Sequence, residues 1–340
     1  GVGDLLKSGW KPRRTMLFCS WDGEEQGMIG STEWGEQHAQ ELEHAAAYLN
    51  MDVGVAGPNF GASAVPALKQ FVRDVTKQVP SPRGGTVYQV WKDARERERI
   101  KNISPDLGGS QNRPPAAKVE SDVEVGDLGS GSDYSVFLQR LGVPSTDIGS
   151  GGPYGVYHSA FDNFAWFKKF ADPDFKYEQE MARVFGVQML HMADADYYPE
   201  DYELYGREIV SYIQQAQEKA KQTFSSATPS FADALAAAQR FQKAGVQIRQ
   251  VQNSPNGDLA RLNRTLADAE RGLLIPQGLP NRPWFRHVIY APGMYTGYAA
   301  VVIPGVNEAI DANNAERTRA QLAVLAEALN RAAGVLESYK

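Results

Sequence analysis

Strand-like and helix-like segments alternate along residues 1–200. The stretches "RTMLFCSW" (14–21) and "AAYLNMDVGVAG" (46–57) are apolar and β-prone, and each runs into a loop that carries acidic residues. "AVPALKQFVRDVTKQV" (64–79) has helical spacing, and "DYSVFLQRLGVPSTDIGS" (133–150) predicts a short helix followed by a strand. This alternation is typical of a layered α/β domain, in which ligands gather beyond the carboxyl ends of the strands.

The pattern becomes helical after about residue 199. Four amphipathic segments follow, covering 202–222, 230–248, 258–274 and 316–337. The last two keep leucine stripes, formed by Leu259, Leu262, Leu266 and Leu273 and by Leu322, Leu325, Leu329 and Leu336. We therefore predict an α/β domain over 1–198 and an up-and-down α-helical bundle over 199–340. Apolar stripes in excess of what one bundle needs favour a homodimer with twofold symmetry through the helices.

Two stretches fit neither pattern. Residues 82–131 are rich in Pro, Gly, Ser and charge, which predicts a long surface loop. The aromatic and proline-rich stretch 279–305 is irregular and is expected to cover a substrate site or an interface. The single cysteine, Cys19, lies in an apolar run and is expected to be a buried core residue.

Charge and composition exclude some classes of partner. The net charge is -6 and no cluster of lysine or arginine forms a basic stripe, which argues against a nucleic-acid partner. No apolar run approaches the roughly 18 residues of a membrane span. The chain starts with "GVGDLLKSG", which resembles the end of a helix and carries neither an initiator methionine nor a signal peptide. We expect the chain to be the later part of a longer protein.

The candidate chemistry begins at "CSWDGEEQGMIGS" (19–31). Adjacent carboxylates where a buried strand ends repel each other and lose solvation, so a positive group should hold them. Asp52 ends the second apolar strand, and His158 lies in the glycine- and aromatic-rich "GSGGPYGVYHSAFDN". A Glu, an Asp and a His at the strand ends of one sheet suit zinc. The alternative is a "DGEE" turn that is merely solvated.

Geometry suggests how the two glutamates divide the work. Neighbouring side chains point in different directions, so one can bind a metal while the other takes a proton from the metal-activated water. Asp133, in "GSGSDY", is expected to cap the following helix, with support of the site as the alternative.

Several blocks together resemble one known family. "GWKPRRTMLFCSWDGEEQGMIGSTEW", "YLNMDV", "LGSGSDYSVFLQRLGVPS", "VYHSAFDN" and "RPWFRHVIYAPGMYTGYA" are similar to glutamate carboxypeptidase II and its relatives. These are co-catalytic dizinc metallopeptidases of the M28 type, in the branch that includes the transferrin receptor. The resemblance implies an M28 α/β/α sheet sandwich, incomplete at its N-terminus, followed by the family's helical dimerisation domain.

The resemblance also implies roles for single residues. Glu24 matches the general base, and Tyr157 the tyrosine that hydrogen-bonds the tetrahedral intermediate. Glu25 and His158 match ligands of one zinc ion, and Asp52 a ligand of the other. Two further sets match positions near the substrate and in a structural calcium site, respectively Gly131, Ser132 and Tyr298, and Glu33 and Glu36.

The sequence departs from the family's pattern at three places. The H-x-D motif that supplies a His and the bridging Asp is not in this sequence, so the dizinc site is expected to be incomplete and the chain inactive alone. Gly297 stands where the family has a glutamate-recognising lysine. "STDIGS" (145–150) replaces an arginine patch, so a strict preference for C-terminal glutamate is not expected.

The leading hypothesis is a zinc exopeptidase that hydrolyses peptides or N-acyl amino acids. The alternatives are an aminopeptidase of the same family and a non-catalytic receptor on the same scaffold, like the transferrin receptor. The presence of Glu24, Glu25, Asp52 and His158 at the positions that match the family's site favours an enzyme. Because relatives mostly work outside the cytoplasm, we expect a secreted, periplasmic or membrane-anchored parent protein.

Overall fold

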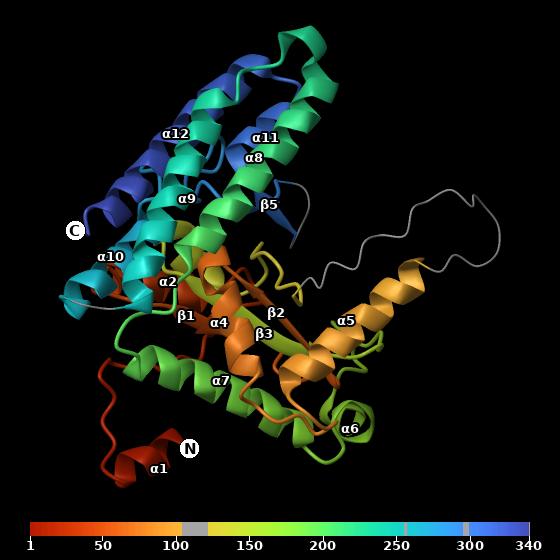
Figure 1. Ribbon diagram of the computed structural model, residues 1–340. Helices are drawn as coiled ribbons and strands as arrows, with labels where there is room; N and C mark the ends of the chain where they lie inside the picture. The colour runs from red at the N-terminus through yellow and green to blue at the C-terminus, as the bar shows by residue number, and fades with distance from the viewer. Residues whose placement is uncertain (104–121, 255–256, 295–298, 340) are drawn as a thin grey trace.

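The computed structural model describes residues 1–103, 122–254, 257–294 and 299–339, without the side chains of 98–103 and 226. Strands and helices are interleaved up to about residue 200, and long helices dominate the rest (Figure 1). The strands are β1 (Tyr48–Asn50), β2 (Asn59–Ala64), β3 (Ser145–Gly151), β4 (Tyr290–Pro292) and β5 (Ala300–Val302). The fold is mixed α/β, as predicted.

The helices before residue 200 are α1 (Val2–Lys7), α2 (Ile29–Gln37), α3 (Ala39–Leu42), α4 (Pro66–Thr76), α5 (Val87–Ile103), α6 (Phe164–Trp166) and α7 (Lys176–Asp194). Those after it are α8 (Tyr202–Phe224), α9 (Ala232–Asn253), α10 (Leu259–Arg271), α11 (Pro304–Asp311) and α12 (Ala315–Glu337). Short helical turns are η1 (Val136–Arg140), η2 (Phe167–Ala171) and η3 (Ser225–Ala227). Within the described residues, no helix is both long and apolar enough to span a bilayer.

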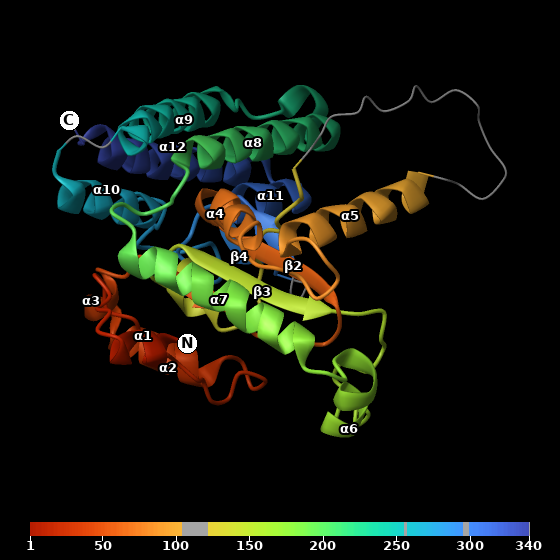
Figure 2. The ribbon, with the colours of Figure 1, turned by 60° about the horizontal axis from the view of Figure 1, so that its bottom comes forward.

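A three-stranded sheet with the order β1-β3-β2 forms the centre of the first half. β1 runs parallel to β3, with Asn50 opposite Asp147, whereas β2 runs antiparallel to β3. Helices α4 and α7 pack on this sheet and on each other. Helix α4 also contacts α8, so it joins the sheet to the helical half, which lies above the sheet in both views (Figures 1 and 2).

The long helices α8, α9 and α12 pack side by side (Figure 2). The two predicted leucine stripes are buried, apart from Leu259, which is half-buried. The short helix α11, which the sequence pattern did not predict, packs between α8 and α12. One hydrophobic cluster runs from Phe60 in β2 and Leu68 in α4 to Leu336 in α12, so the core is continuous across both halves.

The predicted strand 14–21 is wrong. These residues form no β-ladder with any described residue, and Leu17 and Phe18 are 64% and 65% exposed. Cys19 is exposed as well, against the expectation of a core residue. A β-prone sequence becomes a strand only where another strand offers hydrogen bonds, and none of the described strands lies beside this segment.

The predicted loop 82–131 is also wrong in part, because it contains helix α5. Val87 and Trp91, four residues apart, are buried on one face of this helix, and the Trp91 ring meets that of Phe60 edge to face at 4.9 Å. These two apolar side chains of α5 are enough to dock the largely charged helix against β2. Residues 104–121 of the predicted loop lie outside the described part of the chain.

Candidate active site

The acidic corner is a tight turn between the segment 14–21 and helix α2. The amides of Gly27 and Met28 donate to the carbonyl of Glu24 at 2.8 and 2.7 Å, and the Gly30 amide donates to the carbonyl of Asp22 at 2.9 Å. A Cβ on Gly30 would come within 2.5 Å of that Asp22 oxygen, so only glycine fits there. Gly27 has φ +106°, which other residues rarely adopt. The turn therefore fixes where Glu24 and its neighbour project.

Parallel pairing brings the other candidates to the same edge of the sheet. Because β1 and β3 are parallel, their carboxyl ends meet there, as expected from the sequence. Asp52 follows β1 by two residues, and the loop that carries Tyr157 and His158 follows β3. Asn50, at the end of β1, donates to Ser132 Oγ at 2.7 Å and to Asp147 Oδ1 at 2.9 Å. These bonds lock the three segments together.

One cavity of about 480 Å³ collects the predicted site residues. It is lined by Glu24, Glu25, Asp52, Tyr157 and His158 together with Ser130 and Gly131. Residues separated by more than 100 positions in the sequence therefore face one space.

His158 is held in an uncommon conformation beside Glu25. Its Nε2 lies 3.3 Å from Glu25 Oε1. Its φ of +57° is in the left-handed region, where a side chain with a Cβ costs of order 1–3 kcal/mol. The Tyr157 ring stacks on the imidazole, with centroids 3.8 Å apart. Strain of this kind is characteristic of functional sites, where surrounding contacts hold a side chain in place.

The cavity concentrates negative charge. Burial raises the pKa of Glu24, and the carboxylates of Asp52, Asp133 and Glu25 act in the same direction, whereas His158 opposes them. Burial also raises the pKa of Asp133, although a hydrogen bond with Ser31 works against it. A raised pKa makes Glu24 a stronger base than an ordinary surface carboxylate.

The donors around this cavity suit a metal ion in their chemical kind. Nitrogen and oxygen donors from His158, Glu25 and Asp52 face one cavity, and the buried Asp133 Oδ1 has no hydrogen-bond partner. Zinc accepts these ligand types. However, the described residues contain no group of three or more His, Cys, Asp or Glu side chains arranged to hold a metal ion.

Two family models match the chain in consecutive parts. Residues 2–104 match peptidase family M28, and residues 213–337 match the transferrin receptor-like dimerisation domain. The first match contains the acidic corner and Asp52. The first part of the chain is therefore of the M28 peptidase type, and the helical part is of the transferrin receptor-like dimerisation type.

Curated relatives agree with this assignment. A probable glutamate carboxypeptidase of Arthroderma benhamiae is 36% identical over 99% of this chain and 45% of its own length. A probable glutamate carboxypeptidase of Arabidopsis thaliana is 35% identical over 90% of the chain and 42% of its own. An aminopeptidase of Rattus norvegicus is 32% identical over 86% and 39%. The chain thus spans less than half the length of these relatives.

The remaining site predictions in this M28-type protein have different outcomes. Ser132 is buried, and its hydroxyl accepts a hydrogen bond from Asn50, so it helps to hold its loop against the end of β1. Glu36 accepts a hydrogen bond from Trp284 Nε1 at 2.8 Å and pairs with Arg140 at 3.4 Å. These partners compete with calcium for its carboxylate, and the calcium site formed with the exposed Glu33 stays a prediction. Tyr298 lies outside the described residues.

Asp133 directly precedes the helical residues 134–140, as predicted, but its Oδ1 has no hydrogen-bond partner, so it does not cap the helix through that atom. Asp133 also lies near the acidic cavity. Its charge affects Glu24, which supports the alternative role beside the site. Ser130, which the sequence pattern did not single out, lines the cavity beside Gly131, and the repeated glycines of "LGSGSD" were the available signal.

Proposed function

We propose that this chain forms part of a co-catalytic dizinc metallopeptidase that hydrolyses peptides or N-acyl amino acids. The observation that carries the proposal is the Glu25–His158 pair, 3.3 Å apart, which shares one cavity with Glu24 and Asp52. Support also comes from relatives named as carboxypeptidases and an aminopeptidase.

The metal would be held by residues from three loops. Glu25 and His158 would bind one zinc, and Asp52 the other. Zinc takes four ligands in most protein sites, so these three donors leave both ions short of ligands. We propose that further donors outside the described residues complete the site, and that the chain is inactive without them. Bound zinc would act as a Lewis acid that makes water nucleophilic at neutral pH.

The protein's own side chains would handle the proton and the developing charge. Glu24, with its raised pKa, would take a proton from the attacking water and pass it to the leaving amine. Tyr157 lines the same cavity and would donate a hydrogen bond to the oxyanion that forms on the scissile carbonyl. Gly131 lines the same cavity and would contact the substrate.

Three functions are open on this scaffold: a carboxypeptidase, an aminopeptidase and a non-catalytic receptor. Both carboxypeptidases and an aminopeptidase are among the similar proteins. Residues 145–150 form most of β3. Asp147 in this stretch is half-buried, and burial raises its pKa to about 6. The stretch therefore offers no cation to an acidic substrate. Gly297 lies outside the described residues. Survival of the donor set argues against a non-catalytic receptor.

Removal of zinc tests the proposal. In an active preparation we expect about two zinc ions per chain, and hydrolysis that stops on chelation and returns with added zinc. His158→Ala should lose zinc, whereas the exposed His44→Ala should retain it. Metal content is measured by mass spectrometry, and activity with an amino-blocked dipeptide ending in glutamate and with an unblocked amino-acid anilide. Hydrolysis that survives complete removal of zinc contradicts the proposal.

We also propose a homodimer through the helical half. The support is the match to the transferrin receptor-like dimerisation domain. The leucine stripes give no support, because they are largely buried inside the chain.

Analytical ultracentrifugation should show a dimer at micromolar concentration that dissociates on dilution. A monomer throughout that range would count against this interface.

The domain boundary and the cellular location stay predictions. The boundary between the parts at 198/199 could be tested by expressing 199–340 alone, although the continuous core predicts that this piece unfolds easily. The extracytoplasmic location could be tested by fractionation of the native host.

A further inference from the structure

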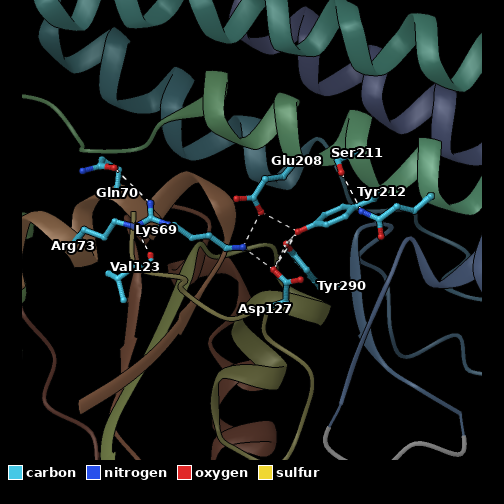
Figure 3. Close-up of polar contacts among 10 residues, drawn as sticks. Lys69, Gln70, Arg73, Val123, Asp127, Glu208, Ser211, Tyr212 and Tyr290 are labelled. Atoms are coloured by element: carbon cyan, nitrogen blue, oxygen red, sulfur yellow. Dashed lines mark hydrogen bonds and ion pairs between the residues drawn. The ribbon is translucent and has the colours of Figure 1, made fainter. Parts of the chain in front are cut away.

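A largely buried cluster of charged and phenolic side chains holds the start of a loop that leads to the candidate site. Lys69 of α4 is only 6% exposed, and its Nζ lies 2.8 Å from Asp127 Oδ1 and 2.7 Å from Glu208 Oε2. The hydroxyls of Tyr212 and Tyr290 each lie 3.1 Å from the same Asp127 oxygen and 2.8 Å from each other. Figure 3 shows these side chains converging from four segments. We call these five residues the Lys69 cluster.

The Lys69 cluster joins the helical half to a loop of the site. Glu208 and Tyr212 belong to α8, and Tyr290 begins β4. Asp127 starts the loop 127–132, whose Ser130 and Gly131 line the candidate cavity. A buried lysine between two carboxylates is costly to separate from them, because a partner left alone would be an uncompensated buried charge. The cluster therefore resists movement of Asp127.

Other bonds anchor the same loop on both sides of its cavity-facing residues. Gly126 exchanges backbone hydrogen bonds with β2, through the carbonyl of Ala62 at 2.9 Å and the amide of Ala64 at 3.0 Å. The side-chain amide of Gln139 donates to the carbonyl of Gly129. Ser132 is tied to the sheet through Asn50. The anchors leave Ser130 and Gly131 facing the cavity in a fixed backbone conformation.

We propose that the Lys69 cluster positions the loop 127–132 at the candidate site, so that helix α8 controls how substrate is bound there. Lys69, Asp127 and Tyr212 are positioning residues that do not touch the cavity donors. The activity readout of this inference rests on the proposed function. The catalytic candidates Glu24, Glu25 and His158 come from other loops, so a loosened loop should weaken substrate binding more than it slows the chemical step.

Hydrogen exchange tests the positioning role without any need for activity. Lys69→Met should raise amide exchange in the peptide 127–133 by about tenfold, while peptides from α9 and α12 keep their protection. The control Lys77→Met removes an exposed lysine just after the end of the same helix, which pairs with Asp74, and should change neither. Unchanged exchange in 127–133, or an equal rise throughout the chain, overturns the proposal.

Two further variants guard against simple misfolding. Tyr212→Phe removes one hydroxyl but keeps the ion pair, and should loosen 127–133 less than Lys69→Met. Lys69→Met combined with Asp127→Asn removes one positive and one negative charge together and should restore part of the protection. No recovery in the double variant contradicts the role of this charge pair.

Kinetics in an active, zinc-loaded preparation complete the test. With the blocked dipeptide as probe, Lys69→Met should raise KM about tenfold and leave kcat within about twofold. A fall in kcat with KM unchanged contradicts positioning of the substrate loop. If exchange rises in 127–133 but no preparation hydrolyses either probe, the positioning role stands and the proposed peptidase function fails.

Discussion

We expect Glu24→Gln to abolish hydrolysis in an active preparation of the protein while zinc stays bound. Glutamine has nearly the same shape as glutamate but cannot accept a proton at catalytic pH. General-base catalysis contributes typically 10²–10⁴-fold, so we expect a loss of at least about 10² in kcat. Initial rates with the cleaved probe and zinc content by mass spectrometry measure the two parts of this expectation.

Two controls make the Glu24 result interpretable. Glu41→Gln changes an exposed glutamate outside the cavity lining and should keep full activity and zinc. Glu25→Gln should lose zinc as well as activity, because it replaces a proposed ligand. Activity of Glu24→Gln within about tenfold of the parent would contradict its role as general base.

The second large effect concerns stability and comes from Glu200. This residue precedes α8, is fully buried, and neither carboxylate oxygen has a hydrogen-bond partner. Burial raises its pKa to about 8, and the nearby Glu270 carboxylate acts in the same direction. Glu270 Oε1 accepts a hydrogen bond from Tyr205 at 2.9 Å and lies 3.0 Å from His287 Nε2, whereas its buried Oε2 has no hydrogen-bond partner.

The direction of the pH effect follows from the proton balance. Well below pH 4.5 Glu200 is protonated in both states, so its ionisation does not change the free energy of unfolding there. As pH rises towards 8 the unfolded chain loses this proton while the folded chain keeps it, so folding becomes less favourable. At about 1.4 kcal/mol per pKa unit, the accumulated penalty is about 5 kcal/mol above pH 8.

We expect Glu200→Gln to remove most of this penalty. At pH 8.5 the variant should be more stable than the parent by several kcal/mol, whereas at pH 5 the two should differ little. Denaturant unfolding across this pH range measures the difference. The exposed Glu327→Gln should follow the parent at every pH. A difference between Glu200→Gln and the parent that does not grow with pH would refute the assignment.

Local sequence patterns were reliable where the chain's own periodicity decides burial. The leucines at 262, 266, 322, 325, 329 and 336 recur at helical spacing, and all are buried in the helices predicted for them. Helix α4 was predicted because apolar residues recur on one face, and Leu68, Phe71, Val72 and Val75 are buried there. The acidic corner could also be found from the sequence, because its adjacent carboxylates stand between glycines, which are typical of a tight turn.

The contacts of the Lys69 cluster were not visible in any sequence pattern. Lys69 interrupts the apolar face of α4 and has no sequence signal that points to Asp127 or Glu208, 58 and 139 positions away. Helix α5 was not predicted because only two of its residues, Val87 and Trp91, are apolar anchors, and charged residues surround them in the sequence. The segment 14–21 had the composition of a strand, yet its state depended on a neighbouring strand that the described residues do not provide.

The sequence by itself therefore determined the class of fold, the helix faces and the residue types of the candidate site. The tertiary structure decided that Glu24, Glu25, Asp52 and His158 face one cavity, and that a buried ion cluster ties α8 to the loop beside it. The physical reason is one of range. Periodicity and turn geometry act over a few residues, whereas burial of a charge and the meeting of strand ends depend on parts of the chain that only folding brings together.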